Sequence, residues 1–421
     1  MMSLNDWIEK LEALDPTRIE LGLERSREVW SRLSTGPITA KVLTVTGTNG
    51  KGTCTVASDT ILRQAGLKVG LYTSPHIRDF NERIQINGLM ETGDELARAF
   101  DRVEAARGDI DLTYFEFTTL ACFDLFQRNE LDVWVLEVGL GGRLDTVNII
   151  DPDVAVITSV AMDHMDWLGN SLKAVAIEKS GIFREGIPVV LGQSDMPPIA
   201  RRKADELNCQ IYQNEREWEA YLETSIGQPQ GWSWQGRSGS NRFALLTGLP
   251  YRSLHLDSLG CAIQAAWLIH PELSEAVIHE GIQRTQLRGR WQSHMTSKGV
   301  EVVLDVAHNP AAGNSLRNLM RQNAVSGRTS CVIGMMADKE HQAFIGEIAP
   351  EIDDWFITHP GSDRGWDGAK IRDELLPGAL YLPNPEIALA NAVNRASPGD
   401  RVLVCGSFLT VAAVMDSEEL S

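Results

Sequence analysis

The stretch TVTGTNGKGT, residues 44–53, joins an apolar, strand-like run to a helical pattern through a glycine-rich turn. Glycines let backbone N–H groups point toward phosphates, and the following helix N-terminus adds positive potential. A lysine supplies a point charge, and a hydroxyl two residues later suits Mg²⁺. The predicted triphosphate-binding residues are Gly47, Thr48, Asn49, Gly50, Lys51, Gly52 and Thr53. The alternative is a glycine turn that only closes a βαβ unit, and the lysine and threonine argue against it.

Short β-branched runs alternate with helical patterns on both sides of this loop, as in LDVWVLEVG (131–139) and, much later, GVEVVLDVAH (299–308). Such alternation predicts right-handed βαβ units. We therefore expect an α/β fold with two doubly wound domains: an N-terminal P-loop ATPase-like domain (1–287) with a mostly parallel sheet, and a smaller Rossmann-like domain (288–421). The Gly/Gln/Ser/Trp-rich piece at 227–242 predicts a hairpin or loop insertion.

Composition limits the partners and the compartment. The net charge is −18, so a polyanion is repelled at long range and we expect no nucleic-acid partner. No apolar run approaches the roughly 20 residues of a membrane span, and the start of the chain lacks an export pattern, so we expect a cytosolic protein with no membrane contact. The six cysteines are scattered, which favours reduced core residues.

Polar residues follow several of the predicted strands. Glu137 ends one strand, where open α/β sheets bind ligands, and it is well placed to hold Mg²⁺. The glycines after it are spaced wrongly for a dinucleotide site, which leaves a flexible substrate loop as the preferred interpretation. Taken alone, His164 is a capping or loop residue and Lys179 a solvated surface lysine.

Further motifs resemble the Mur-ligase superfamily, and the glycine after Lys51 resembles its folylpolyglutamate synthase branch. The motifs are IELGLERSREVWSRL (19–33), LYTSPHIRDFNERIQING (71–88), TYFEFTTLACF (113–123), LEVGLGGRLDTVNI (136–149), DHMDWLG (163–169), IEKSGIF (177–183), GRWQ (289–292), LDVAHNP (304–310), IGMMADK (333–339) and VLVCGSF (402–408). The first and third are similar to those of bifunctional bacterial dihydrofolate synthase/folylpolyglutamate synthases.

The resemblance implies a set of metal and catalytic residues. Two Mg²⁺ ions are expected, with Ser74, Glu137, His164 and Thr53 as their ligands or close neighbours. Lys179 corresponds to a lysine that CO₂ carbamylates in the family, which needs a neutral amine. Lys51, His164, Lys179 and His308 are the expected catalytic residues.

The resemblance also assigns substrate contacts. Arg290 reaches the ATP phosphates, Asp305 the ribose, and His308 and Ser407 the incoming glutamate. Three candidates for the pterin are Phe115, Phe117 and Asp145, although Phe at helical spacing is as often core. Ser258 stands where relatives usually carry an asparagine near adenine, so the chain departs from the family pattern at this position.

The implied activity is ATP-dependent ligation of L-glutamate to dihydropteroate and to reduced folates through an acyl phosphate, by a monomer. One alternative keeps only the folylpolyglutamate synthase activity, and another is a cell-wall Mur ligase that acts on UDP-muropeptides. A P-loop kinase or motor NTPase and a non-enzymatic nucleotide switch fit less well, because neither needs Glu137, His164 and a second α/β domain.

Overall fold

The computed structural model describes residues 2–13, 18, 20–225, 228–237, 242–251 and 253–420. The chain forms two compact units. The first contains the chain to Glu223 with Gln230–Pro250 and His255–Gln286, and the second contains Thr224–Pro229, Tyr251–Leu254 and Leu287–Ser421. Ile19 of the predicted pterin segment and residues 226–227 and 238–241 around the predicted hairpin lie outside the described residues.

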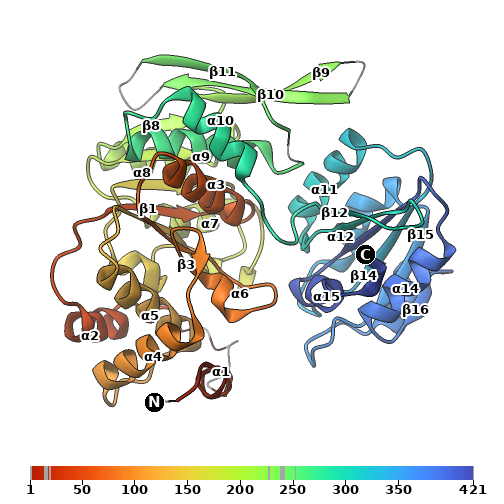
Figure 1. The fold of residues 1–421 in the computed structure, drawn as a ribbon, viewed down its shortest axis with the longest axis horizontal. Coiled ribbons are helices and arrows are strands. Elements are labelled where there is room, and N and C mark those ends of the chain that lie inside the picture. Colours follow the sequence, from red (N-terminus) through yellow and green to blue (C-terminus); the bar gives the residue numbers. More distant parts are fainter. Residues whose placement is uncertain are drawn as a thin grey trace. The chain divides into compact units, whose positions relative to one another are not determined.

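An eight-stranded sheet forms the centre of the first unit (Figure 1). Its strands, in spatial order, are β4 (Leu89–Met90), β3 (Ile84–Ile86), β2 (Val69–Tyr72), β5 (Val133–Glu137), β1 (Lys41–Thr46), β6 (Val154–Ile157), β7 (Pro188–Leu191) and β8 (Gln210–Gln213). Strands β2, β5, β1, β6, β7 and β8 are parallel to one another. Strands β3 and β4 form an antiparallel edge beside β2. The chain order changes direction at β1, so the carboxyl end of β1 is the position where such sheets bind ligands.

Helices cover both faces of this sheet, since strands buried on both sides need apolar cover on each. One face packs against α1 (Leu4–Glu12), α2 (Glu24–Leu33), α4 (Gly93–Arg107), α5 (Tyr114–Arg128), α7 (Leu172–Ser180) and α8 (Pro198–Glu206). On the other lie α3 (Lys51–Gln64), α9 (Leu256–Ile269) and α10 (Glu275–Arg284). Shorter elements are η1 (Phe80–Arg83), η2 (Thr146–Ile149) and α6 (Met165–Leu168).

The Trp-rich region forms a second, three-stranded sheet in the order β11 (Phe243–Leu249), β10 (Gln228–Arg237), β9 (Glu219–Ser225). Strands β10 and β11 are antiparallel. Trp232 and Trp234 are fully buried, which explains why aromatic residues occur in an otherwise polar stretch. The described part therefore agrees with the predicted hairpin.

The second unit is a six-stranded sheet, and every pairing except that of β12 is parallel. In spatial order its strands are β12 (Gln292–Met295), β13 (Glu301–Leu304), β17 (Arg401–Cys405), β14 (Thr329–Ile333), β15 (Asp354–Thr358) and β16 (Leu380–Leu382). Its helices are α11 (Pro310–Gln322), α12 (His341–Ile348), η3 (Ala349–Glu351), α13 (Gly368–Leu375), α14 (Pro385–Arg395), α15 (Phe408–Val414) and η4 (Glu418–Leu420). The prediction of two doubly wound units is confirmed, while the antiparallel edge strand β12 was not predicted.

In the part of the chain that the structure describes, no helix combines the length and apolar character needed to cross a membrane.

Candidate active site

The glycine-rich loop lies between β1 and α3, at the switch point of the sheet. Residues after β6 hold its backbone: the Thr48 N–H donates to Ser159 O (2.8 Å), and the Asn49 N–H donates to Ser159 Oγ (2.9 Å). Thr158 Oγ1 donates to Asn49 O (2.7 Å). Gly50 has φ +81°, a left-handed conformation that glycine adopts without strain. The loop is thus fixed before any phosphate binds.

Lys51 and Thr53 begin the helix after this loop. The Lys51 ammonium donates to Gly47 O (2.9 Å) and Thr48 O (3.4 Å), so its charge lies over the loop itself. Thr53 is buried in the first turn of α3, beside Gly52. Cation, loop N–H groups and helix terminus together suit the terminal phosphates of a nucleotide.

Ser74 and Glu137 come together at the ends of two neighbouring strands. The Ser74 N–H donates to Glu137 Oε2 over 3.3 Å, and Glu137 is buried at the end of β5. The described residues contain no group of three His, Cys, Asp or Glu side chains that could hold a metal. The Glu137 carboxylate beside Ser74 nevertheless fits Mg²⁺, which keeps waters and shares its remaining positions with phosphates.

Lys179 lies in the last turn of α7 and is 3% exposed. Burial first, and then Lys51, hold the pKa of its amine well below the usual 10.5, while Asp163 and Asp145 act in the opposite direction. The surface position expected from the sequence alone is therefore wrong, and a neutral amine is favoured here.

His164 has a different setting, because its side chain is 43% exposed. It has a left-handed backbone (φ +49°) at the start of α6, its N–H donates to Asp163 Oδ1 (2.9 Å), and its Nε2 lies 4.0 Å from the same oxygen. Its neighbour Asp163 thus contacts it and also acts on Lys179.

Phe115 and Asp145 meet at Gly139. A Cβ on that glycine would lie 2.6 Å from the Phe115 ring and 3.3 Å from Asp145 Oδ2. Burial raises the pKa of Asp145 to about 6, although N–H groups of Leu140 and Val147 donate to it (2.9 Å each). Phe117 lies instead in the core and is 2% exposed, so of the two candidate rings only half-buried Phe115 retains a surface for stacking.

Sequence reasoning did not single out a buried arginine beside Tyr114, the residue before Phe115. Arg83 is 6% exposed, its Nε donates to His76 Nδ1 (2.7 Å), and its guanidinium lies 5.4 Å from the Tyr114 ring centre. Burial, followed by Arg83, lowers the pKa of His76 to about 4. An aromatic-lined cation at the start of α5 suits an anionic substrate group, and its only sequence signal was its place in the motif at 71–88.

The second unit gathers its predicted residues at the carboxyl ends of β13 and β17. The Arg290 guanidinium lies 5.4 Å from the Phe408 ring centre, and the His308 ring lies 6.0 Å from it. Asp305 is buried, accepts the N–H groups of Trp291 and Ala307 (2.9 Å each), and has its pKa raised by burial against the opposing charge of Arg290. Ser407 precedes Phe408 and caps α15 through the Thr410 N–H (3.0 Å).

Ser258 is buried near the start of α9, directly against the phosphate loop. A Cβ on Gly50 would lie 2.1 Å from Ser258 Oγ, and this oxygen is 3.3 Å from His255 Nδ1. The residue that departs from the family pattern therefore contacts the loop backbone.

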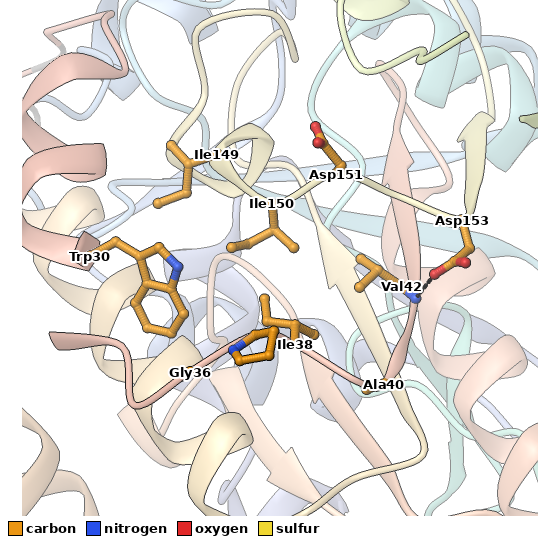
Figure 2. A pocket seen from close by; sticks show the side chains of 10 residues that line it. Trp30, Gly36, Ile38, Ala40, Val42, Ile149, Ile150, Asp151 and Asp153 are labelled. Atoms are coloured by element: carbon orange, nitrogen blue, oxygen red, sulfur yellow. Dashed lines mark hydrogen bonds between the residues drawn. The ribbon is translucent and has the colours of Figure 1, made fainter. Parts of the chain in front are cut away.

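A hollow of about 360 Å³ lies at the amino ends of β1 and β6, the opposite end of these strands from the phosphate loop. Figure 2 shows the Trp30 indole beside Ile38, with Ile149 and Ile150 above, and Asp153 bonded to the Val42 N–H (2.8 Å). None of the predicted site residues lines this hollow, and we assign no role to it.

Comparison with known proteins agrees with this geometry. The Mur ligase middle domain matches residues 45–230, and the Mur ligase glutamate ligase domain matches residues 289–408. The dihydrofolate synthase/folylpolyglutamate synthase of Escherichia coli (strain K12) is 38% identical over 413 residues, which cover 98% of this chain and 95% of the relative.

Solved structures show the same similarity. Escherichia coli FolC in complex with DHPP and ADP has a TM-score of 0.91 and 37% identity, over 99% of this chain and 97% of that one. A bifunctional folylpolyglutamate synthase/dihydrofolate synthase with Mn, AMPPNP and L-glutamate bound has a TM-score of 0.88 and 40% identity, over 99% and 98%. The chain belongs to the dihydrofolate synthase/folylpolyglutamate synthase family of Mur ligases.

Proposed function

We propose that this protein is an ATP-dependent ligase that couples L-glutamate to dihydropteroate, making dihydrofolate, and extends the glutamate tail of reduced folates. The observation that carries the proposal is the phosphate loop with the Ser74–Glu137 contact at the carboxyl edge of one sheet, together with the buried amine of Lys179. A simple P-loop turn does not need a buried carboxylate and a buried lysine beside it.

Gly47 to Thr53 would hold the ATP phosphates, with Arg290 and Asp305 of the second unit on the phosphates and ribose. For two Mg²⁺ ions we assign Ser74, Glu137 and Thr53 to one and His164 to the other. Bound metal supplies charge neutralisation at the terminal phosphates. A carbamate on Lys179 would convert a buried amine into an oxygen donor that helps to order these ligands.

The chain's own residues would act mainly by positioning and electrostatics, as is usual in phosphoryl transfer. Lys51 neutralises charge on the terminal phosphate while the substrate carboxylate attacks it, which yields an acyl phosphate and ADP. The glutamate amine then attacks the acyl carbon and phosphate leaves. His308 and Ser407 are the proposed contacts for glutamate, and Phe115 and Asp145 are those for the pterin.

In domain terms we propose that residues 1–287 bind ATP and the pterin compound, and that residues 288–421 present glutamate. We further propose a monomer in the cytosol, since neither reaction requires a second copy of the chain. Light scattering across a concentration series tests the monomer, and a mass that doubles at micromolar concentration would contradict it.

The test of function is phosphate release from ATP with Mg²⁺ and glutamate, with product masses measured for three acceptors. We expect turnover with dihydropteroate and with a reduced folate monoglutamate, each gaining one glutamate. Turnover with the reduced folate alone would restrict the protein to tail extension. Turnover with only a UDP-muropeptide would overturn the folate assignment.

A further inference from the structure

The loop after β5, residues 139–148, is bonded to the end of the helix that carries Lys179. The Arg143 N–H donates to Glu178 O (2.8 Å), and the Arg143 guanidinium donates to Glu178 Oε1 from Nη2 (2.9 Å) and Nε (3.1 Å). On its other side, Thr46 Oγ1 donates to Gly141 O (2.6 Å). The loop that the sequence suggested to be flexible is therefore bonded to both β1 and α7.

Asn148 links the same two segments from inside the protein, since it is only 4% exposed. Its Nδ2 donates to Arg143 O and to Gly181 O, both over 3.0 Å, and its Oδ1 accepts from Arg184 Nη2 (3.0 Å). This pattern fixes the orientation of the amide, because a flipped amide would place its oxygen against two carbonyl oxygens. Every polar atom of the side chain is thus used in holding the loop to the helix end.

The backbones at this junction are in close contact. A Cβ on Gly181 would lie 2.3 Å from the Arg143 Cβ, and a Cβ on Gly142 would lie 3.1 Å from Lys179 O. Two glycines, one on each segment, allow this approach. A change in the backbone of the loop must therefore displace the turn of α7 that contains Lys179.

We propose that Asn148 is a positioning residue that clasps the 139–148 loop to the end of α7 and so holds in place the turn that carries Lys179. The inference rests on the proposed role of Lys179. The partly exposed Arg143–Glu178 ion pair contributes less than the buried amide, because solvent screens exposed pairs and an unpaired buried group is costly. Asn148 has no direct contact with substrate in this proposal.

The first measurement is lysine accessibility in the full-length protein. Asn148→Asp keeps the shape of the side chain but removes both amide hydrogens. With an amine-reactive label and peptide mass spectrometry, we expect Lys179 to react about 10-fold faster in N148D, while Lys173, exposed on the same helix, reacts at the wild-type rate. Asn148→Ser keeps one donor and is expected to give an intermediate rate if the aspartate variant folds poorly.

The second measurement separates positioning from binding. We expect kcat of N148D to fall about 10- to 100-fold with the KM for ATP within about twofold of wild type, since misplacement of a catalytic group affects the chemical step. The control is Ser171→Ala, which removes the N-cap bond to the Ala174 N–H (3.2 Å) at the opposite end of α7 and should leave kcat and Lys179 labelling unchanged.

Unchanged Lys179 labelling and kcat in N148D would overturn the proposal, as would equal acceleration at Lys173, which indicates general loosening of the helix. A similar effect of S171A would overturn it too. If wild-type protein showed no ligase turnover, the proposed function would fail, and the labelling comparison would still decide whether Asn148 holds Lys179 in place.

Discussion

Lys179 is a long cationic side chain held almost entirely out of water. Burial and the nearby Lys51 lower the pKa of its amine, whereas Asp163 and Asp145 only partly oppose them. Because an isolated ammonium in the interior is costly, a lysine in this position either stays a neutral amine or is converted into a negatively charged group such as a carbamate. Reaction with CO₂ would give the second outcome, and it requires a neutral amine, which these surroundings favour.

For Lys179→Ala we expect kcat to fall about 10²- to 10³-fold, the usual cost of losing one preorganised charge-stabilising group. Wild-type protein equilibrated with ¹³C-bicarbonate should show a carbamate carbon signal by NMR that K179A lacks. Lys173→Ala, on the exposed side of the same helix, is the matched control and should keep both activity and signal. A carbamate signal that persists in K179A would assign the modification to another lysine.

Asp59 of α3 is a second buried ionisable group, and it bears on stability. It is 1% exposed, Arg63 donates to its Oδ2 (2.9 Å), and its Oδ1 has no partner. Burial raises its pKa from 3.8 to about 6, despite the opposing effect of Arg63. Since the folded-state pKa is raised, its contribution to stability is fully present below about pH 3.8 and is lost as the pH rises through 6.

Asp59→Asn removes this titration. We expect the free energy of unfolding of D59N, relative to wild type, to increase by about 2 kcal/mol between pH 4.5 and 7.5. Urea unfolding at the two pH values measures it, with Asp205→Asn on the surface of α8 as a control for the loss of one negative charge. A difference between D59N and wild type that is the same at both pH values would show that Asp59 titrates alike in the folded and unfolded chain.

At the scale of elements, the contact between the phosphate loop and α9 decides which substitutions the loop tolerates. Gly50 and Gly66 have almost the same φ angle, +81° and +85°, in the left-handed region. An added Cβ at Gly50 would meet Ser258 Oγ at 2.1 Å, whereas one at Gly66 would meet nothing within 4 Å. The pair therefore separates backbone strain, which both share, from collision with α9, which only Gly50 has.

We expect Gly66→Ala to cost about 1 kcal/mol of stability, the price of a left-handed alanine, and to leave the KM for ATP unchanged. Gly50→Ala should cost more and raise the KM for ATP about 10-fold or more, because the loop must shift. Removing the blocking oxygen in Gly50→Ala/Ser258→Ala should recover part of that loss. If the double variant did not recover ATP affinity, backbone strain at Gly50, and not the contact with α9, would account for the effect of the substitution.

The elements most open to prediction were those with short-range signals. The run at 44–53 predicted strand, loop and helix because glycine conformation, apolar patterning and helix start coincide there. Long-range packing decided the rest: Phe117 follows the same helical pattern as Phe115, but it faces Trp7 and Phe100 in the core. The bonds of Asn148 to Gly181 and Arg184 span 33 and 36 residues, and no local sequence pattern predicts them.

At the scale of the whole molecule, each unit has its own group of proposed site residues at the carboxyl edge of its own sheet. In the second unit, His308 Nδ1 is bonded to Val306 O (2.8 Å), which fixes the ring and assigns Nδ1 as the protonated nitrogen. In the neutral imidazole, Nε2 is then an acceptor of the kind that the amine of glutamate requires. If one unit presents glutamate for both reactions, a change there must affect both alike.

We therefore expect His308→Ala to raise the KM for glutamate about 10- to 100-fold, because one hydrogen bond to a charged group is lost. The factor should be the same with dihydropteroate and with a reduced folate as the acceptor. The KM for ATP should change little. His294→Ala, on the edge strand β12 of the same unit, is the control and should leave all three constants near wild type. A change in the KM for glutamate with only one acceptor would mean that the two reactions bind glutamate differently. A change mainly in the KM for ATP would assign His308 to nucleotide binding and not to glutamate binding.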